Sequence, residues 1–335
     1  MSDHACYVVP VSLSPHPNAD KLAMVNGILG GYCCGVSKAD FADVTKAAFI
    51  PPDSLVPVAH PDFSFLKGLA YRDPHPYAGF ARITVKKFRG LYSDGLLVKV
   101  PEGMPVGADA AEFLGVKHYE PIEQEGLGAH LCGDAAGIDG FGHKYDIENL
   151  RRHADAMLNR QVIATEKLHG CNARYQWRNG VMHCGSRSHW KKPGTNVWWA
   201  ALTPQMVDFC MQYPHMQLFG EVVGKVQKGF DYSAPGDAHF VAFDVDDTQT
   251  GTWLEHDTLR AVMADYGIPT VPELYRGAFQ MNELLALAEG PSVLAPAGAP
   301  CREGVVVKAT PEARHPRLGR LQFKLVGNGY YEATK

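Results

Sequence analysis

The residues with the clearest chemical potential surround Lys167, in the segment ATEKLHGCNARY. This segment has the pattern K-x-H-G-x-N, whose members are Lys167, His169, Gly170 and Asn172. An amine attacks phosphorus only in its neutral form, and an unperturbed lysine has a pKa of about 10.4. A nearby positive charge would therefore be needed to disfavour the ammonium and lower the pKa of Lys167. Taken alone the pattern is weak, and an ordinary solvated lysine at a strand end is the alternative.

Further motifs follow the lysine in order along the chain. GSRSHW supplies Arg187, LFGEVVG supplies Glu221, HFVAFDV supplies Phe243, REGVVVK supplies Glu303 and LQFKLV supplies Lys324. Each of these motifs is short enough to occur by chance in an unrelated chain. Their joint occurrence in one order over residues 166–324 is a much stronger signal than any single motif.

This series of motifs resembles that of the ATP-dependent RNA ligases, which are covalent nucleotidyltransferases. The resemblance implies that Lys167 is the catalytic nucleophile and carries AMP, with ATP as the donor and Mg²⁺ or Mn²⁺ required. It also implies a reaction in which 3′-OH and 5′-phosphate ends are joined through lysyl–AMP and a 5′-adenylylated polynucleotide. The nucleotide-binding residues that it implies are Lys167, His169, Asn172, Arg187, Glu221, Phe243, Glu303 and Lys324.

The residue types suit the roles that the resemblance implies. Phosphoryl transfer depends on positioning and on neutralising charge, which Arg187, Lys324 and a metal ion would do at the phosphates. The resemblance also implies that Lys324 and a bound metal lie near Lys167, and we expect these cations to disfavour the ammonium and lower the pKa of Lys167. Glu303 would hold the metal directly or through water. Glu221 would accept hydrogen bonds from ribose hydroxyls, and Phe243 would stack on adenine.

Some positions stay open on the sequence alone. The last motif of the family is usually K-x-K, but its first lysine is replaced here by Gln322, so either one phosphate contact is lost or Lys308 or Lys225 supplies it. A phenylalanine in a strand is most often a core residue, and Phe240 is an alternative to Phe243 for stacking.

The roles of three charged or titratable residues also have ordinary alternatives. Glu221 and Glu303 could be partners in surface ion pairs, and His169 could be a structural histidine. For the whole chain, the alternatives are a capping-type guanylyltransferase and a tRNA-binding or RNA-binding accessory protein without activity. The histidine in the lysine motif disfavours the former, and the intact set of Lys167 and the two glutamates disfavours the latter.

The elements that must position these residues predict a mixed α+β domain with mainly antiparallel sheets and flanking helices. Strands are expected at VIATEKL, NARYQWR, QLFGEVV, HFVAFDV, GVVVKAT and LQFKLV, and helices at TPQMVDFCMQ, DTLRAVMADYG and FQMNELLALAEG. A further amphipathic helix is expected at DIENLRRHADAML, with Ile147, Leu150 and Met157 inward and Arg151 and Arg152 outward.

Residues 1–118 have a different character, with short strands separated by proline and glycine. The segment SPHPNADKLAMVNG resembles the tRNA-binding OB-fold domain of some aminoacyl-tRNA synthetases, which implies an OB-type β-barrel. We interpret residues 16–20 (HPNAD) as a turn that closes this barrel, and Lys86, Lys87 and Arg89 as an RNA-binding patch.

The order of the domains favours one group of ligases. We expect an OB domain at 1–118, a glycine-rich linker at 119–142 and the nucleotidyltransferase domain at 143–335. DNA ligases and capping enzymes carry an OB domain after the last motif, whereas here it precedes the lysine. This order resembles that of nick-sealing RNA ligases, which implies a nicked RNA or RNA/DNA duplex as partner, with RNA on the 3′-OH side.

Composition sets the remaining limits. The 335 residues include 32 basic and 36 acidic ones, so the net charge of −4 excludes a uniformly basic nucleic-acid sleeve. Residues 143–192 nevertheless hold ten Lys or Arg against four Asp or Glu, which could be a solvated face or a local RNA-binding one. There is no P-loop, GxSxG, HExxH or CxxC motif, and no apolar run long enough to cross a membrane. The chain is expected to be cytoplasmic, with reduced cysteines.

Overall fold

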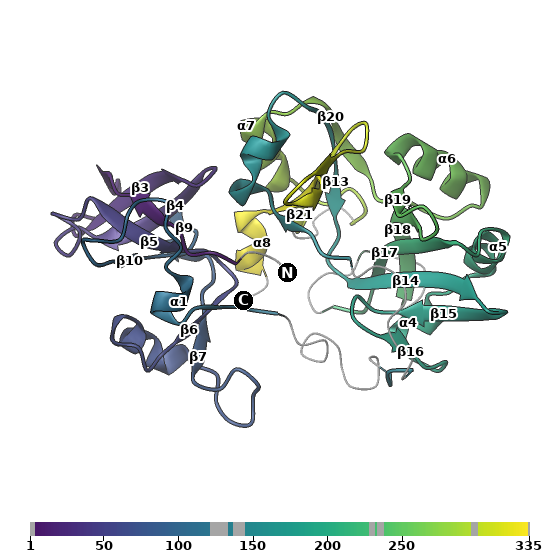
Figure 1. Cartoon of the computed structure of the whole chain (residues 1–335), viewed down its shortest axis with the longest axis horizontal. Coiled ribbons are helices and arrows are strands. Elements are labelled where there is room, and N and C mark those ends of the chain that lie inside the picture. Colours follow the sequence, from purple (N-terminus) through teal and green to yellow (C-terminus); the bar gives the residue numbers. More distant parts are fainter. Residues whose placement is uncertain are drawn as a thin grey trace. The chain divides into compact units, whose positions relative to one another are not determined.

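A computed structural model describes residues 4–120, 133–136, 145–227, 232, 238–295 and 301–333. The chain divides into two compact units, Met1–Pro121 and Ile122–Lys335. Each unit is mixed α+β and rich in antiparallel sheet, with few helices (Figure 1). The predicted linker at 119–142 falls largely outside the described residues.

The first unit consists mostly of short strands. They are β1 (Val8–Pro10), β2 (Leu13–Pro15), β3 (Leu22–Ile28), β4 (Tyr32–Ser37), β5 (Lys46–Ile50), β6 (Ser54–Pro57), β7 (Phe80–Arg82), β8 (Lys86–Phe88), β9 (Leu91–Ser93), β10 (Leu96–Lys99) and β11 (Lys117–His118). Its helices are the 3₁₀ helix Pro61–Leu69 and α1 (Ala111–Leu114).

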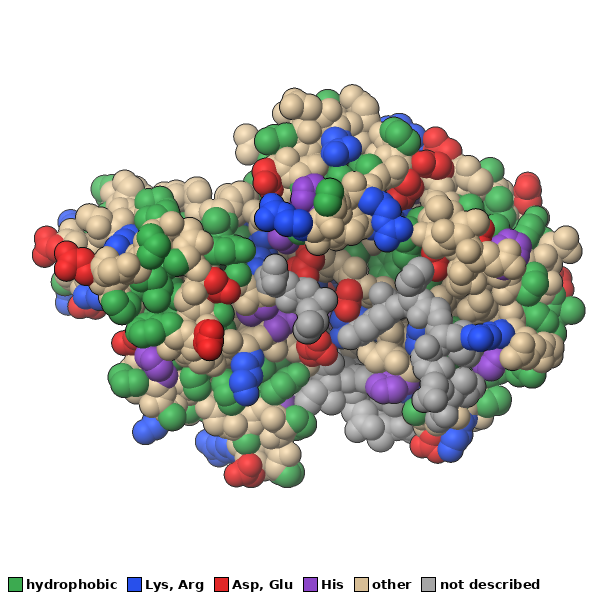
Figure 2. Space-filling model, viewed as in Figure 1, with side chains coloured by type: hydrophobic (Ala, Val, Ile, Leu, Met, Phe, Trp, Pro, Cys, Tyr) green, Lys and Arg blue, Asp and Glu red, His purple; other side chains and the backbone are tan. Residues whose placement is uncertain are grey.

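The central strand of the first unit is β5, because its two faces belong to two different cores. Ala48 and Ile50 lie in one apolar cluster, whereas Ala47 and Phe49 lie in the other. The strands pair as β1-β5-β10, β11-β6-β7, β2-β3-β4 and β8-β9, and no closed barrel forms among the described strands. On the face drawn in Figure 2, apolar side chains gather over this unit.

The HPNAD segment holds the β8–β9 hairpin in place. His16 is buried, and its Nε2 lies 3.0 Å from the carbonyl oxygen of Phe88. The side chain of Asn18 donates to the carbonyl oxygen of Arg89 at 2.9 Å. These contacts agree with the interpretation of the segment as a structural turn, and they fix the backbone that carries the basic patch.

The second unit contains the longer strands. They are β12 (Glu148–Asn149), β13 (Gln161–Lys167), β14 (Cys171–Arg178), β15 (Val181–Gly185), β16 (Trp190–Lys191), β17 (Met216–Gly224), β18 (Ala238–Asp247), β19 (Thr252–Trp253), β20 (Glu273–Ala278), β21 (Gly304–Ala309), β22 (Arg314–His315), β23 (Gly319–Arg320) and β24 (Gln322–Val326). The helices are two 3₁₀ turns, Leu150–Arg152 and Ala154–Met157, and α4 (Val197–Ala200), α5 (Pro204–Gln212), α6 (His256–Asp265), α7 (Met281–Ala288) and α8 (Asn328–Ala333).

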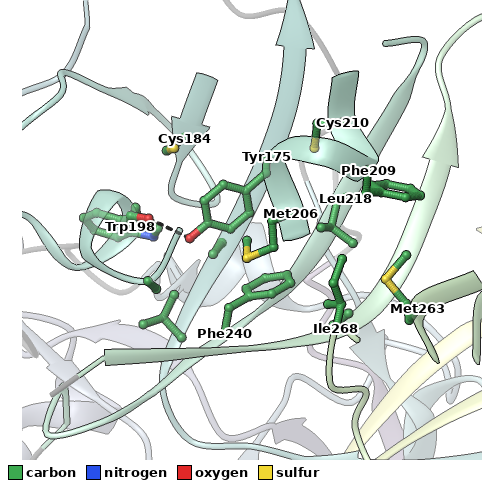
Figure 3. Close-up of a cluster of buried hydrophobic side chains, with 14 of the residues drawn as sticks. Tyr175, Cys184, Trp198, Met206, Phe209, Cys210, Leu218, Phe240, Met263 and Ile268 are labelled. Carbon is green, nitrogen blue, oxygen red and sulfur yellow. Dashed lines mark hydrogen bonds between the residues drawn. The ribbon is translucent and has the colours of Figure 1, made fainter. Parts of the chain in front are cut away.

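Two sheets organise this unit. One has the strand order β16-β15-β14-β17-β18-β19, and the other has the order β12-β24-β21-β13-β20. Every pairing within them is antiparallel among the described strands except β12 with β24. One face of the six-stranded sheet packs on α5 and α6 (Figure 3). Alternation along β14 sends Ala173 and Tyr175 to that core and Asn172 and Arg174 to the opposite face.

The expected helix at DIENLRRHADAML is wrong. Residues Glu148–Asn149 pair with β24, which requires an extended backbone, and only two short 3₁₀ turns follow. The side chain of Asn149 accepts from the backbone N–H of Arg151 and begins the first turn. Arg151 is buried and not outward as expected, whereas Leu150 and Met157 do reach the core.

Among the described residues, no helix is both long and apolar enough to cross a membrane.

Candidate active site

Strand pairing brings Lys167 to Glu303. Lys167 ends β13, where it pairs with Gly304 of β21, so the residue before Gly304 lies beside the lysine. The Nζ of Lys167 is 2.7 Å from Oε1 of Glu303. Gly304 is required here because a Cβ would lie 2.1 Å from the carbonyl oxygen of Leu325 on β24. The lysine and E-G motifs thus meet through the register of one sheet.

The second carboxylate comes from the other sheet. Glu221 of β17 lies opposite Asn172 of β14. Its Oε1 accepts from the backbone N–H of Gly170 at 3.0 Å. A Cβ at Gly170 would lie 2.2 Å from the carbonyl oxygen of Val222, so only glycine allows this turn to pack against β17. Lys167, Glu221 and Glu303 therefore form one cluster.

The electrostatics of the cluster differ from the sequence expectation. Burial lowers the pKa of Lys167, but the negative charges of Glu303 and Glu221 outweigh it, so the pKa lies above that of an ordinary lysine. The pKa of Lys167 is thus raised in this structure and not lowered as expected, because carboxylate charges outweigh the effect of burial. Lys167 is an ammonium as long as the charges of Glu303 and Glu221 outweigh the effect of burial.

The pKa of Glu221 lies above that of an exposed glutamate. Burial raises its pKa to about 8, although the charge of Lys167 and the hydrogen bond from Gly170 act against this rise. A protonated or half-protonated Glu221 can donate as well as accept a hydrogen bond. It can therefore contact ribose hydroxyls in either sense.

The raised pKa of Glu221 predicts a pH-dependent stability. The folded chain keeps a proton that the unfolded chain releases above pH 4.5, so stability falls as pH rises from there through about 8. Glu221→Gln cannot ionise and retains the acceptor for Gly170. We expect its Tm to equal that of the natural chain near pH 4 and to exceed it by about 5 °C at pH 8, as thermal unfolding would show. The exposed Glu283→Gln is the control, and an equal pH trend for Glu221→Gln and the natural chain would contradict the raised pKa.

Phe243 and Phe240 are separated by the structure. Phe243 is half-buried beside Leu168 and Val223, and its ring centroid is 4.7 Å from that of Tyr145. Phe240 is buried in the core between the six-stranded sheet and its helices, edge-on to the ring of Tyr175 (Figure 3). Phe240 as a stacking alternative is therefore wrong, and Phe243 remains the candidate.

Arg187, Asn172 and Lys324 have different surroundings in the structure. Arg187 donates to Asp146 at 2.6 Å. Asn172 lies opposite Glu221, and its buried Oδ1 has no hydrogen-bond partner in the described part of the chain. Lys324 lies on β24, where it pairs with Val306 of β21. Asn172 therefore directly adjoins a member of the cluster.

The departure at Gln322 leads to a buried network. Gln322 is buried and donates to the hydroxyl of Tyr145, which in turn donates to Asp244. Lys308 is also buried and pairs with Asp244 at 2.9 Å. Burial raises the pKa of Asp244, but Arg320 and Lys308 outweigh it and bring the pKa to about 2. Lys308 is thus committed to an ion pair inside the unit and does not replace a phosphate-binding lysine.

The other proposed replacement, Lys225, is exposed at the end of β17. Its role as a replacement for the missing lysine stays a prediction.

Two tyrosines near the lysine motif were missed by the sequence reasoning. Tyr232 accepts from the backbone N–H of His169 at 2.7 Å, and the hydroxyl of Tyr330 lies 3.0 Å from Nδ1 of His169. Neither tyrosine belongs to a motif with a recognisable spacing from Lys167. The sequence signal for them is only that a tyrosine follows the FGE motif and another follows the motif that contains Lys324.

The donors at this site fit a hard divalent cation. Mg²⁺ and Mn²⁺ prefer oxygen ligands, and Mg²⁺ is usually held by one or two carboxylates together with substrate phosphates. Glu303 and the unpartnered Oδ1 of Asn172 supply such oxygens. No cluster of three or more His, Cys, Asp or Glu is placed to hold a metal within the ranges that the structure covers. A metal ion held by these oxygens would take its other ligands from substrate phosphates.

Comparison with known proteins places this geometry in a family. Residues 160–326 match the family model described as RNA ligase. No curated protein sequence matches the chain. A structure of a Naegleria gruberi RNA ligase variant with ATP and Mn is 20% identical, with a TM-score of 0.80 and 98% of both chains covered. A ligand-free variant of the same protein is 21% identical, with a TM-score of 0.81 and coverage of 99% and 98%. Its structure with pyrophosphate gives 20% identity, a TM-score of 0.79 and 98% coverage of both chains.

At these identities the solved structures show a shared fold. The family match extends from the start of β13 to the end of β24, and it includes every proposed site residue from Lys167 to Lys324. Residues 160–326 of the chain thus match the RNA ligase family, and the chain is an enzyme of that class.

Proposed function

We propose that this chain is an ATP-dependent RNA ligase that seals 3′-OH and 5′-phosphate ends through lysyl–AMP. The observation that carries the proposal is the cluster of Lys167 with Glu303 and Glu221, which two sheets assemble inside the region matching the family. The Naegleria gruberi RNA ligase, which has been solved with ATP, AMP and Mn, supports ATP and a divalent metal. The proposed contacts of Arg187, Phe243 and Lys324 with the nucleotide belong to this proposal.

The reaction begins at Lys167, which must lose a proton before it attacks. A divalent ion held by Glu303 would add positive charge beside Lys167 and the phosphates, and this favours the neutral amine. Nζ then forms a bond to the α-phosphorus while the bond from that phosphorus to pyrophosphate breaks. Glu221 and Phe243 would orient the nucleoside so that the α-phosphate faces Nζ.

Two later steps complete the proposed cycle. The AMP passes from Lys167 to the 5′-phosphate of the polynucleotide, and the 3′-OH then attacks that phosphate and expels AMP. We propose a nick in a duplex as the substrate, with RNA on the 3′-OH side. Support for this comes from the order of the domains and from the basic surplus in residues 143–192.

Sealing assays on matched nicks test the substrate. We expect the chain, with ATP and Mg²⁺ or Mn²⁺, to seal a duplex nick faster when the 3′-OH nucleotide is ribose than when it is deoxyribose. Equal rates on both nicks would contradict the proposed preference for RNA on the 3′-OH side. Faster joining of free single strands would contradict the proposal that a nick is the substrate. Failure to join any end while lysyl–AMP forms would point to another acceptor.

The first unit is part of the same proposal. We assign it as an OB-type domain over 1–118, followed by a linker at 119–142 and the ligase domain at 143–335, and propose that it holds the duplex. The exposed side chains of Lys86, Lys87 and Arg89 on the β8–β9 hairpin support this role. A cytoplasmic location rests on the sequence expectation alone.

The basic hairpin predicts a salt-dependent binding defect. We expect the full-length triple variant Lys86→Gln, Lys87→Gln, Arg89→Gln to form lysyl–AMP normally but to bind nicked duplex more weakly. Each lost phosphate contact should reduce the slope of log affinity against log salt by roughly 0.7 to 0.9. A titration of both proteins at several salt concentrations measures this. Lys67→Gln, an exposed lysine on the 3₁₀ helix Pro61–Leu69, is the control, and equal slopes for the triple variant and the natural chain would exclude the hairpin from the duplex.

A further inference from the structure

The last helix of the chain contributes a side chain to the lysine motif. Tyr330 lies on α8, beyond the last motif, and its hydroxyl is 3.0 Å from Nδ1 of His169. The two rings also meet edge to face, with centroids 5.3 Å apart and planes at 67°. Both a polar and a ring contact therefore join α8 to the loop that follows Lys167.

The position of Tyr330 is fixed by the backbone around it. Both carboxylate oxygens of Glu289 accept backbone N–H groups at the start of α8, from Asn328 at 2.6 Å and from Gly329 at 2.9 Å. The N–H of Gly327 donates to the carbonyl oxygen of Glu303 at 3.0 Å. A Cβ at Gly327 would lie 2.5 Å from the carbonyl oxygen of Ala288, so the close approach to α7 requires glycine. These contacts anchor the start of α8 to α7 and to Glu303.

Two neighbours of Nδ1, Glu303 and Tyr330, bear on the tautomer of His169. A neutral imidazole donates from one nitrogen and accepts at the other. Oε2 of Glu303 lies 3.8 Å from Nδ1, and a carboxylate on that side favours a proton on Nδ1. Nε2 would then carry a lone pair and no proton, so it would repel a phosphate oxygen instead of donating a hydrogen bond to it. A hydroxyl that donates to Nδ1 reverses this preference and leaves the proton on Nε2.

We propose that Tyr330 is a positioning residue for adenylylation of Lys167: its hydroxyl donates to Nδ1 of His169, so that Nε2–H is the donor offered to a nucleotide phosphate. This inference rests on the proposed function, since it concerns the lysyl–AMP step. It extends the site to α8 and Glu289, beyond the motifs that define the lysine cluster.

Single-turnover formation of lysyl–AMP at saturating ATP tests the role. Tyr330→Phe retains the ring contact and loses only the hydroxyl, and we expect its rate to fall roughly tenfold. His169→Ala should fall about a hundredfold, as for loss of one oriented donor. Because Tyr330 acts through His169, the double variant should be no slower than His169→Ala. Tyr331→Phe is the matched control and should keep the natural rate.

A measurement without turnover tests the tautomer itself. In ¹⁵N NMR spectra of the full chain, the histidine signals lost in His169→Ala identify His169. They should report the Nε2–H form in the natural chain and a shift towards the Nδ1–H form in Tyr330→Phe. An Nδ1–H form in the natural chain, or multiplicative rate losses in the double variant, would overturn the proposal. Absence of lysyl–AMP in the natural chain would instead overturn the proposed function.

Discussion

Replacing Glu303 with alanine is expected to slow adenylylation of Lys167 by at least a hundredfold. Oε1 of its carboxylate lies 2.7 Å from Nζ of Lys167, and Glu303 is the side chain proposed to hold the metal. Electrostatic groups aimed at developing phosphate charge are commonly worth two to three orders of magnitude each in a partly dry site. The rate of AMP transfer to the protein, measured in a single turnover with excess ATP, gives the effect.

Two further variants separate the roles of Glu303. Glu303→Gln removes the charge and keeps the shape, and it should be almost as slow as Glu303→Ala if the metal is held through that charge. Asp265→Ala, an exposed carboxylate on α6, is the control and should leave the rate unchanged. A Glu303→Gln rate equal to that of the natural chain would show that Glu303 acts only as a partner of Lys167 and not as a metal ligand.

Lys324→Ala is expected to lower sealing by about a hundredfold, whereas Gln322→Ala should lower it little. Both residues lie on β24 at positions that share one face of the strand. Lys324 is the proposed phosphate contact, and a lost cation at a phosphate costs about 3 kcal/mol in such a site. Gln322 instead donates to the hydroxyl of Tyr145 within a buried network. Its loss should cost stability of about 1 kcal/mol, seen in thermal unfolding, with the sealing rate largely retained.

The pair of variants also has a contrary outcome. Equal losses of sealing for Gln322→Ala and Lys324→Ala, with both proteins folded, would mean that Gln322 contacts the phosphates. A gain of sealing in Gln322→Lys would mean that the natural chain lacks one phosphate contact and tolerates a charge beside Tyr145.

The sequence predicted the long strands of the second unit because their apolar residues alternate with the period of a sheet. Lys167 and Glu221 were therefore placed correctly within strands, and Glu303 directly before one. Their contacts were a different matter, since the 2.7 Å approach of Lys167 to Glu303 depends on the pairing of β13 with β21. Pairing between segments that are far apart in the sequence leaves no local pattern in either one. The contact between Lys167 and Glu303 could therefore be expected only from the order of the motifs.

The errors have physical causes that local patterns do not contain. Arg151 lies on a segment with helical periodicity, but pairing of Glu148–Asn149 with β24 prevents a continuous helix. The pKa of Lys167 was expected to fall because a cation was assigned beside it, whereas the charges of two carboxylates raise it. Tyr330 could not be anticipated, because its role depends on where α8 returns to the loop after Lys167.

The most direct test of the account is to map AMP on the chain and then remove it with a nick. Protein incubated with ATP and Mg²⁺ or Mn²⁺ would be digested and its AMP-bearing peptide identified by mass spectrometry. We expect AMP on Lys167 alone, none in Lys167→Ala, no equivalent modification from GTP, and release of the AMP as a nicked duplex with a ribose 3′-OH is sealed. AMP on another residue, transfer from GTP in preference to ATP, or lysyl–AMP that no nicked duplex discharges would contradict the account.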